Sequence, residues 1–186
     1  EDISKLEREY NKPQQRGRHP KIGFLNTGNF RFLFYRFLYK FSDHAFFSKT
    51  YVREMDQPMF SHREGNKLLF YIEDLIGLDK NSPENIEILN NNLNALSEML
   101  SKKGIKLHFM PAPDKYTVYQ DHILNNPYPR SIFFDVLRKL PKRYDFIDLK
   151  DLFDKAHVSG VRDLYYYDDT HWHWKSSEMI AESMKF

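Results

Sequence analysis

Short apolar segments alternate with helical patterns along the middle of this chain, and this alternation limits the possible folds more than any other feature. Residues 68–72, 105–110 and 144–149 are apolar runs of the length of a strand. Between them lie two segments with helical periodicity, one after Ser82 and one over residues 131–140. Strand, helix, strand, helix, strand is typical of a parallel sheet covered by helices, so we expect an α/β fold.

The first of these helices has sequence signals at both ends. Ser82 is a suitable N-cap, Pro83 suits the first helical position, and Gly104 supplies a C-terminal stop. Apolar residues at spacings of three and four then predict one buried face, made of Ile86, Leu89, Leu93, Leu96 and Leu100. Two further helices are expected, a short one that begins over residues 152–156 and another over residues 175–185.

The amino-terminal part is basic and aromatic, although the formal charge of the whole chain is only +2. From Arg16 to Arg53 there are eight basic residues, and Asp43 is the only acid. Core-like spacing of the aromatic residues favours an amphipathic helix that buries Phe, Leu and Tyr and exposes Arg and Lys. A surface for nucleic acid or for lipid is the alternative, and the weak overall charge argues against nucleic acid.

The chain divides into a loose polar lead-in (1–20), a basic and aromatic segment (21–60) and an α/β domain (61–186). With 186 residues, one domain with a real core is expected. The lack of cysteine excludes disulfides, zinc–thiolate sites and cysteine catalysis. No apolar run reaches the roughly 18 residues that span a membrane. Because the chain opens without methionine, we expect a processed product whose targeting segment has been removed.

The residues best suited to chemistry lie between Tyr165 and Trp174. Two carboxylates, two imidazoles and both tryptophans of the chain occur within residues 168–174. Asp169 and His171 are two residues apart, so in a turn the aspartate could accept a hydrogen bond from Nδ1 of the histidine. That bond would fix the tautomer and leave Nε2 to take a proton from a nucleophile.

Two other interpretations of this segment stay open. In the first, it is a loop in which Asp169 or Thr170 caps the next helix and the tryptophans pack on the sheet. In the second, a metal is held by borderline and hard ligands at tight spacing, namely Asp168, Asp169, His171 and His173.

Four segments resemble the SGNH hydrolase-like family of the alginate O-acetylation proteins AlgJ and AlgX. Asp169-Thr170-His171-Trp172 is similar to the Asp-Thr-His-Trp motif of that family. Three further landmarks agree in order and approximate spacing, at residues 64–70, 104–107 and 110–119. The resemblance covers about residues 61–186 and implies a three-layer αβα fold with a mainly parallel, flavodoxin-like sheet. The Pro111–Lys115 segment would then follow a strand at the edge where ligands bind.

The resemblance also implies a Ser-His-Asp triad, in which Asp169 and His171 are catalytic and the serine follows on a later strand. Ser176, Ser177 and Ser183 fall in the expected helix, so none of them suits that role. We therefore expect a domain that is incomplete at its C-terminus, with the nucleophile beyond Phe186.

The expected activity is that of a polysaccharide O-acetyltransferase or acetylesterase, with no cofactor. Its partners would be a polysaccharide acceptor and an acetyl donor or donor protein, with no nucleic acid, and a membrane-associated partner is a further candidate. Trp172, Lys115 and Tyr167 are the expected substrate-binding residues, and the family implies an extracytoplasmic location. A non-catalytic carbohydrate-binding protein of the same fold and a metal-dependent hydrolase are the alternatives.

Overall fold

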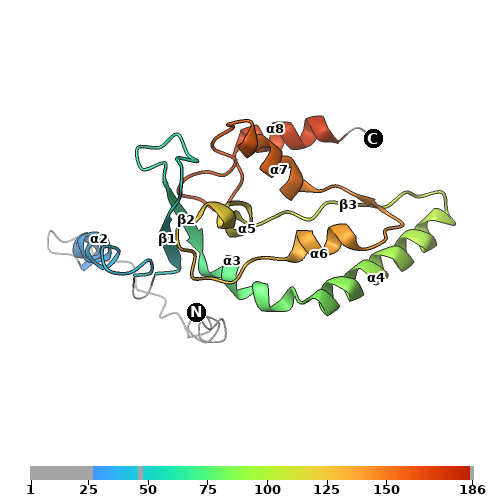
Figure 1. Cartoon of the computed structure of the whole chain (residues 1–186), viewed down its shortest axis with the longest axis horizontal. Coiled ribbons are helices and arrows are strands. Elements are labelled where there is room, and N and C mark those ends of the chain that lie inside the picture. Colours follow the sequence, from blue (N-terminus) through green and yellow to red (C-terminus); the bar gives the residue numbers. More distant parts are fainter. Residues whose placement is uncertain (1–26, 46–47, 185–186) are drawn as a thin grey trace.

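The computed structural model describes residues 27–45 and 48–184; the predicted polar lead-in over residues 1–20 lies outside them. The elements run in the order α2 (Thr27–Leu38), β1 (Thr50–Glu54), β2 (Lys67–Tyr71), α3 (Ile72–Ile76), η1 (Leu78–Lys80), α4 (Pro83–Ser101), β3 (His108–Phe109), α5 (Lys115–Tyr119), η2 (Gln120–His122), α6 (Phe133–Lys139), β4 (Asp145–Phe146), α7 (Leu149–Val158) and α8 (Trp174–Ser183). Figure 1 shows α4 and α6 on one side of β3, and α7 and α8 on the other. The α/β class is therefore confirmed.

Parallel pairing is confined to β3 and β4, where His108 lies opposite Asp145 and Phe109 opposite Phe146. These two strands were expected, but they are shorter than the apolar runs that predicted them. The strand over residues 68–72 is also present as β2, yet it pairs antiparallel with β1 rather than joining the parallel pair. A short connection over residues 55–66 permits this antiparallel hairpin, whereas a parallel partner needs a longer crossover.

Helix α4 begins where the sequence predicts, but its buried face differs from the predicted one. The Ser82 hydroxyl accepts the amide of Asn85 at 3.2 Å. Ile86 is buried as expected, whereas Leu96 is 42% exposed, and the polar residues Asn90 and Ser97 are buried instead. Asn90 donates to a backbone carbonyl after α6 and accepts the Tyr144 hydroxyl at 2.9 Å. Those bonds make its burial tolerable.

Three other predicted helices are present as α6, α7 and α8 with shifted ends, whereas the short helices α3 and α5 were not predicted. α7 begins at Leu149, earlier than expected, because the carboxylate of Asp148 accepts the amide of Asp151 at 3.0 Å and caps the helix. α8 begins at Trp174, and His173 is its N-cap. The capping role considered for Asp169 and Thr170 therefore belongs to His173.

One aromatic-rich core joins the β1–β2 hairpin to α5, α7 and the segment before α8. Tyr51, Phe70 and Tyr116 are at most 1% exposed, and their rings form a chain with centroid separations of 5.5 and 5.2 Å. All five residues of α5 are buried. This rigid element follows β3 directly and reaches the loop that holds the candidate catalytic residues.

The amphipathic helix predicted in the basic and aromatic segment exists as α2, but its apolar residues are not buried as predicted. The exposed set is Leu33, Phe34 and Phe37, with Phe41 just beyond the helix. Among the residues that the structure describes, no helix is long and apolar enough to cross a membrane.

Candidate active site

A short hairpin over residues 164–173 displays the candidate catalytic residues. Tyr165 pairs antiparallel with Trp172, and the amide of Tyr166 donates to the carbonyl of His171 at 3.1 Å. Because side chains alternate across a strand, neighbours in this hairpin point to opposite faces. Tyr165 and Trp172 face the core, while Tyr166 and His171 share the outer face.

Asp169 and His171 form a dyad at the turn of this hairpin. Oδ1 of Asp169 lies 2.7 Å from Nδ1 of His171 and also accepts the amide of Thr170 at 2.6 Å. The hydrogen bond from His171 is the main cause that lowers the pKa of the Asp169 carboxyl. The His171 side chain is 79% exposed. An ionised carboxylate on Nδ1 favours the tautomer whose Nε2 is free to accept a proton, so this histidine can act as a general base.

The buried side chain of Lys115 holds the loop that contains the dyad from its core side. This lysine is 1% exposed, and its Nζ donates to the carbonyls of Tyr166 at 2.7 Å, Tyr167 at 2.8 Å and Asp169 at 3.1 Å. Burial lowers the pKa of Lys115 to about 8, against the opposing effect of nearby acids. The sequence led us to expect Lys115 to contact substrate, but its ammonium group is occupied by three backbone carbonyls. Lys115 is therefore a positioning residue.

Two carboxylates bind the first turn of α5, which begins at Lys115. Asp114 caps the helix by accepting the amide and the hydroxyl of Thr117 at 2.6 and 3.0 Å. Asp74, from α3, accepts the amide of Tyr116 at 3.3 Å. Burial, with the nearby Asp114, raises the pKa of Asp74 to about 7. The segment after β3, which the sequence predicts to lie near the functional site, thus contacts the loop that contains Asp169 and His171.

The two aromatic residues expected to bind substrate are used mainly for packing. Tyr167 stacks on His62 with ring centroids 4.0 Å apart, and Trp172 packs edge-on against Phe153 at 6.4 Å. Both are partly buried and contact the core. These contacts do not test whether Tyr167 or Trp172 also binds substrate, so that role stays a prediction.

An exposed aromatic row lies beside the dyad instead. Tyr166 and Trp174 are 40% and 58% exposed, and the ring of His173 lies between them, with centroid separations of 4.6 and 5.5 Å. This row was not predicted, because residue type alone does not distinguish outward from inward aromatic side chains. The alternation of hairpin side chains would have selected Tyr166 over Tyr167.

Two of the three serines after His171 are engaged in structural bonds, and the third, Ser177, is exposed on α8. Ser176 is buried and its hydroxyl donates to the carbonyl of Leu164 at 2.7 Å, while the hydroxyl of Ser183 donates to Ile180 at 2.8 Å. Among the side chains that the structure describes, no serine or threonine hydroxyl forms a hydrogen bond with the ring of His171. A nucleophile is therefore not assigned within these residues.

The metal site considered as an alternative is not formed by the described residues. Over residues 27–45 and 48–184, no group of three or more His, Asp or Glu side chains is placed to hold a metal ion. His173 is turned toward the first turn of α8, where its Nδ1 accepts the amide of Lys175 at 3.3 Å. The tight spacing of the four proposed ligands in sequence is thus not matched by convergence in space.

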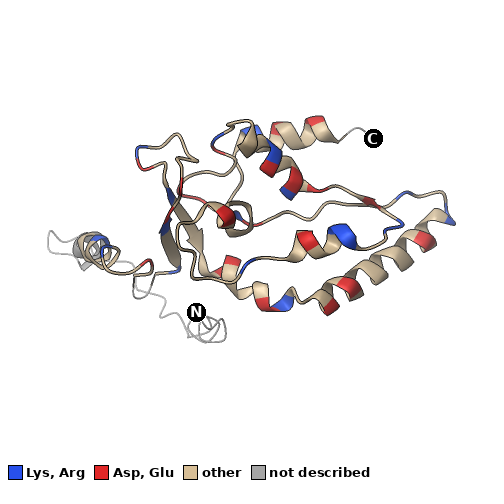
Figure 2. Cartoon of the chain, viewed as in Figure 1, with Lys and Arg blue, Asp and Glu red and all other residues tan. Residues whose placement is uncertain are grey.

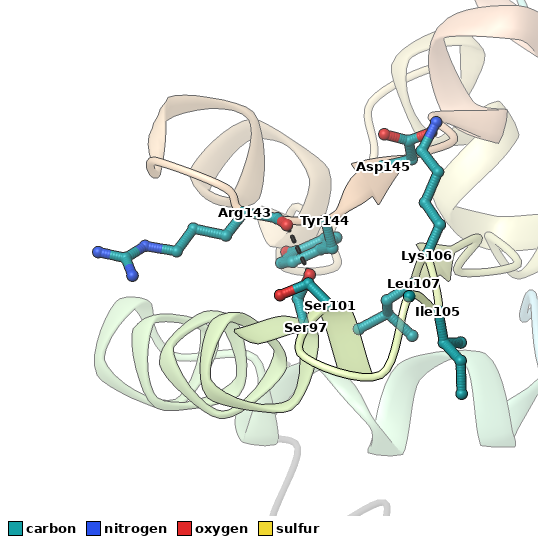
Figure 3. A pocket seen from close by; sticks show the side chains of 9 residues that line it. Ser97, Ser101, Ile105, Lys106, Leu107, Arg143, Tyr144 and Asp145 are labelled. Atoms are coloured by element: carbon teal, nitrogen blue, oxygen red, sulfur yellow. Dashed lines mark hydrogen bonds and ion pairs between the residues drawn. The ribbon is translucent and has the colours of Figure 1, made fainter. Parts of the chain in front are cut away.

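A cavity of about 290 Å³ lies elsewhere, between the end of α4 and the start of β4 (Figure 3). The hydroxyls of Ser97 and Ser101 donate to backbone carbonyls, and Lys106 pairs with Asp145 at 2.5 Å. The guanidinium of Arg143 pairs with Glu98. These occupied groups offer no activated nucleophile, so the exposed dyad remains the better candidate.

A comparison with known protein families finds a match, and its range includes the hairpin. Residues 66–184 match the model described as SGNH hydrolase-like domain, acetyltransferase AlgX. No curated protein and no solved structure matches the chain. The matched range includes β2, the Lys115 segment and the whole hairpin, and it covers more than half of the residues. The chain therefore belongs to the SGNH hydrolase-like family of the acetyltransferase AlgX.

Proposed function

We propose that this protein contributes the base and its orienting acid to an O-acetyl transfer onto polysaccharide hydroxyls. The observation that supports this most strongly is the 2.7 Å contact between Asp169 and Nδ1 of His171, with the imidazole otherwise exposed. Membership of the AlgX acetyltransferase family supports the reaction class. The nucleophile in this proposal is a serine from chain outside the described residues.

In the first half-reaction, the serine oxygen attacks the acetyl carbonyl of the donor ester while Nε2 of His171 takes the hydroxyl proton. The donor's ester bond then breaks, and the imidazolium returns that proton to the leaving oxygen. In the second half-reaction, a sugar hydroxyl attacks the acetyl-serine and loses its proton to His171, which passes it back to the released serine. Asp169 stabilises the imidazolium in both halves. With water as acceptor the same steps give an acetylesterase.

The acceptor is inferred from the surface beside the dyad. Tyr166, His173 and Trp174 present an exposed aromatic row, and apolar sugar faces stack on such rings. The row is open rather than enclosed, as suits a polymer that is longer than the site. An extracytoplasmic location and a separate acetyl donor or donor protein complete the proposal.

The test is acetyl-ester turnover by the full-length protein, with p-nitrophenyl acetate as probe and with an acetylated donor plus polysaccharide acceptor. His171→Ala should lower kcat about 10²- to 10⁴-fold, the usual contribution of a general base. His108→Ala is the matched control, because that histidine also pairs with an aspartate, at 3.3 Å, but lies on β3. Equal activity of the two variants would disprove the role of His171.

A second candidate is glycan binding without catalysis. It is favoured because, among the described side chains, no serine or threonine hydroxyl forms a hydrogen bond with the ring of His171. The two proposals separate cleanly. If the protein only binds glycans, Trp174→Ala weakens its affinity for polysaccharide. The wild type then shows only the uncatalysed rate of acetyl turnover, and His171→Ala does not change that rate. In the enzyme, the wild type turns over and His171→Ala does not.

A further inference from the structure

Helix α2 is attached to the body of the protein by one of its sides. The hydroxyl of Tyr39, just after the helix, lies 2.8 Å from Oγ of Ser48 and 2.7 Å from the carbonyl of Thr50 in β1. Burial raises the pKa of the Tyr39 hydroxyl. This anchor fixes which side of α2 faces the protein and which side faces outward.

The outward side is the apolar one. Leu33, Phe34, Phe37 and Phe41 are 58%, 55%, 56% and 76% exposed. Spacings of three and four place them on one stripe, and the rings of Phe37 and Phe41 touch edge-on with centroids 5.0 Å apart. A helix packed on a core would bury such a stripe, and a contiguous exposed apolar patch marks an interaction surface.

Cations border this stripe. Arg36 in α2 and Lys40 in the turn after it are both exposed, four residues apart, and lie along the same edge of the stripe. From residue 27 to residue 42 the sequence contains no acid, and Figure 2 shows blue but no red on α2. A complementary partner surface has an apolar region that contacts the stripe and negative charges that pair with the bordering cations.

We propose that α2 and the turn after it bind the surface of an anionic lipid bilayer. Exposed phenylalanines flanked by Arg and Lys are the pattern of a helix that lies in the plane of the headgroups. At 12 residues α2 is ~18 Å long, too short to cross a bilayer but suited to this shallow position. A second copy of the chain would bring an equally acid-free surface against it, so its cations would find no partners.

This mode of docking leaves the dyad accessible. Figure 1 places α2 at one end of the molecule, beyond β1, with α4, α6 and α8 extending away from it. The hairpin with His171 directly precedes α8. A bilayer held at α2 therefore does not cover the exposed imidazole.

The test is co-sedimentation of the full chain with vesicles of phosphatidylcholine alone or with added phosphatidylglycerol. We expect binding to the vesicles that contain phosphatidylglycerol, weakened by salt. The double variant Phe37→Ser/Phe41→Ser should lose more than about tenfold in affinity. Arg36→Glu/Lys40→Glu should abolish the preference for the anionic vesicles.

The matched control is Ile88→Ser/Met99→Ser, which removes two residues of α4 that are 57% and 64% exposed. It should bind vesicles as the wild type does, and circular dichroism should show all variants folded. Failure of the wild type to sediment with anionic vesicles would overturn the proposal. So would a dimer that dissociates in Phe37→Ser/Phe41→Ser without any vesicle binding, since a second copy would then cover the stripe.

Discussion

Nζ of Lys115 lies 3.1 Å from the carbonyl oxygen of Asp169, so a buried cation holds the main chain of the residue that orients His171. The dyad itself is exposed and occupies the turn of a short hairpin. Its geometry therefore depends on an anchor beneath the loop. Helix α5 supplies that anchor, because Lys115 is its first residue and all of α5 is packed in the core.

Replacing Lys115 by Met should destabilise the protein and loosen the dyad. Three carbonyls would lose their shared donor, and a buried polar group without a partner costs roughly 1–3 kcal/mol. We expect the free energy of unfolding to fall by about 3 kcal/mol in urea titrations. Lys106→Met is the control, since Lys106 is 68% exposed and its ion pair with Asp145 lies at the surface, where such pairs contribute little to stability. Equal losses in the two variants would contradict the anchoring role.

His157 should make the stability fall in mild acid. Burial lowers the pKa of this histidine from 6.5 to about 4, with further effects of His122 and Lys150. Neither ring nitrogen has a hydrogen-bond partner within the described part of the chain, and Tyr119 packs on the ring at 5.0 Å. Between pH 6.5 and 4 the unfolded chain therefore binds a proton that the folded protein does not, so stability decreases as the pH falls.

The variant His157→Phe removes that proton from both states. The difference in Tm between variant and wild type should shift in favour of the variant as the pH is lowered from 7.5 to 5. Parallel Tm curves for the two proteins would show that His157 does not cause the acid sensitivity.

Asp163 should be one of the least replaceable surface residues. Its φ is +61°, and its carboxylate accepts both the amide and the hydroxyl of Ser61, at 2.7 and 2.6 Å. Asp163→Ala loses these bonds and also the polar side chain that helps an aspartate tolerate the left-handed region, at a combined cost of about 3 kcal/mol. Asp163→Asn keeps an acceptor and tolerates the conformation, so it should cost about half as much. Calorimetry that ranks the two equally would contradict this.

Gly65 occupies a position that has no room for a Cβ. A Cβ at this position would lie 2.1 Å from the carbonyl oxygen of Phe60, while the amides of Met59 and Phe60 donate to the Gly65 carbonyl. Gly65→Ala should therefore lower the free energy of unfolding by at least about 2 kcal/mol. Gly77→Ala is the control, because its Cβ would meet only the Glu73 carbonyl at 3.9 Å, and it should be neutral or slightly stabilising.

Local sequence signals predicted the elements better than their partners. Ser82 and Pro83 define the start of α4 through contacts within one turn, so they could be read without knowledge of the fold. The pairing of β1 with β2 depends on residues more than ten positions apart, and nothing in either strand excludes a parallel partner. The outward direction of Phe37 depends on the bond of Tyr39 to β1, which is also non-local.

In the candidate site, too, contacts between residues close in sequence could be predicted and contacts between distant residues could not. The bond between Asp169 and His171 spans two residues, so the motif alone was sufficient to expect it. The contact of Lys115 with the dyad loop could not be predicted, because its three acceptors lie more than fifty residues away in sequence. Periodicity could have separated the outward Tyr166 from the inward Trp172.

The protonation state of His171 tests the central claim most directly, because it does not depend on which serine is the nucleophile. We propose long-range ¹H–¹⁵N NMR of the ring nitrogens at a pH where the imidazole is neutral, with His171→Ala to assign the signals. The account predicts a proton on Nδ1 and a bare Nε2, and a shift toward the Nε2-protonated tautomer in Asp169→Ala. A proton on Nε2 in the wild type, unchanged by Asp169→Ala, would contradict it.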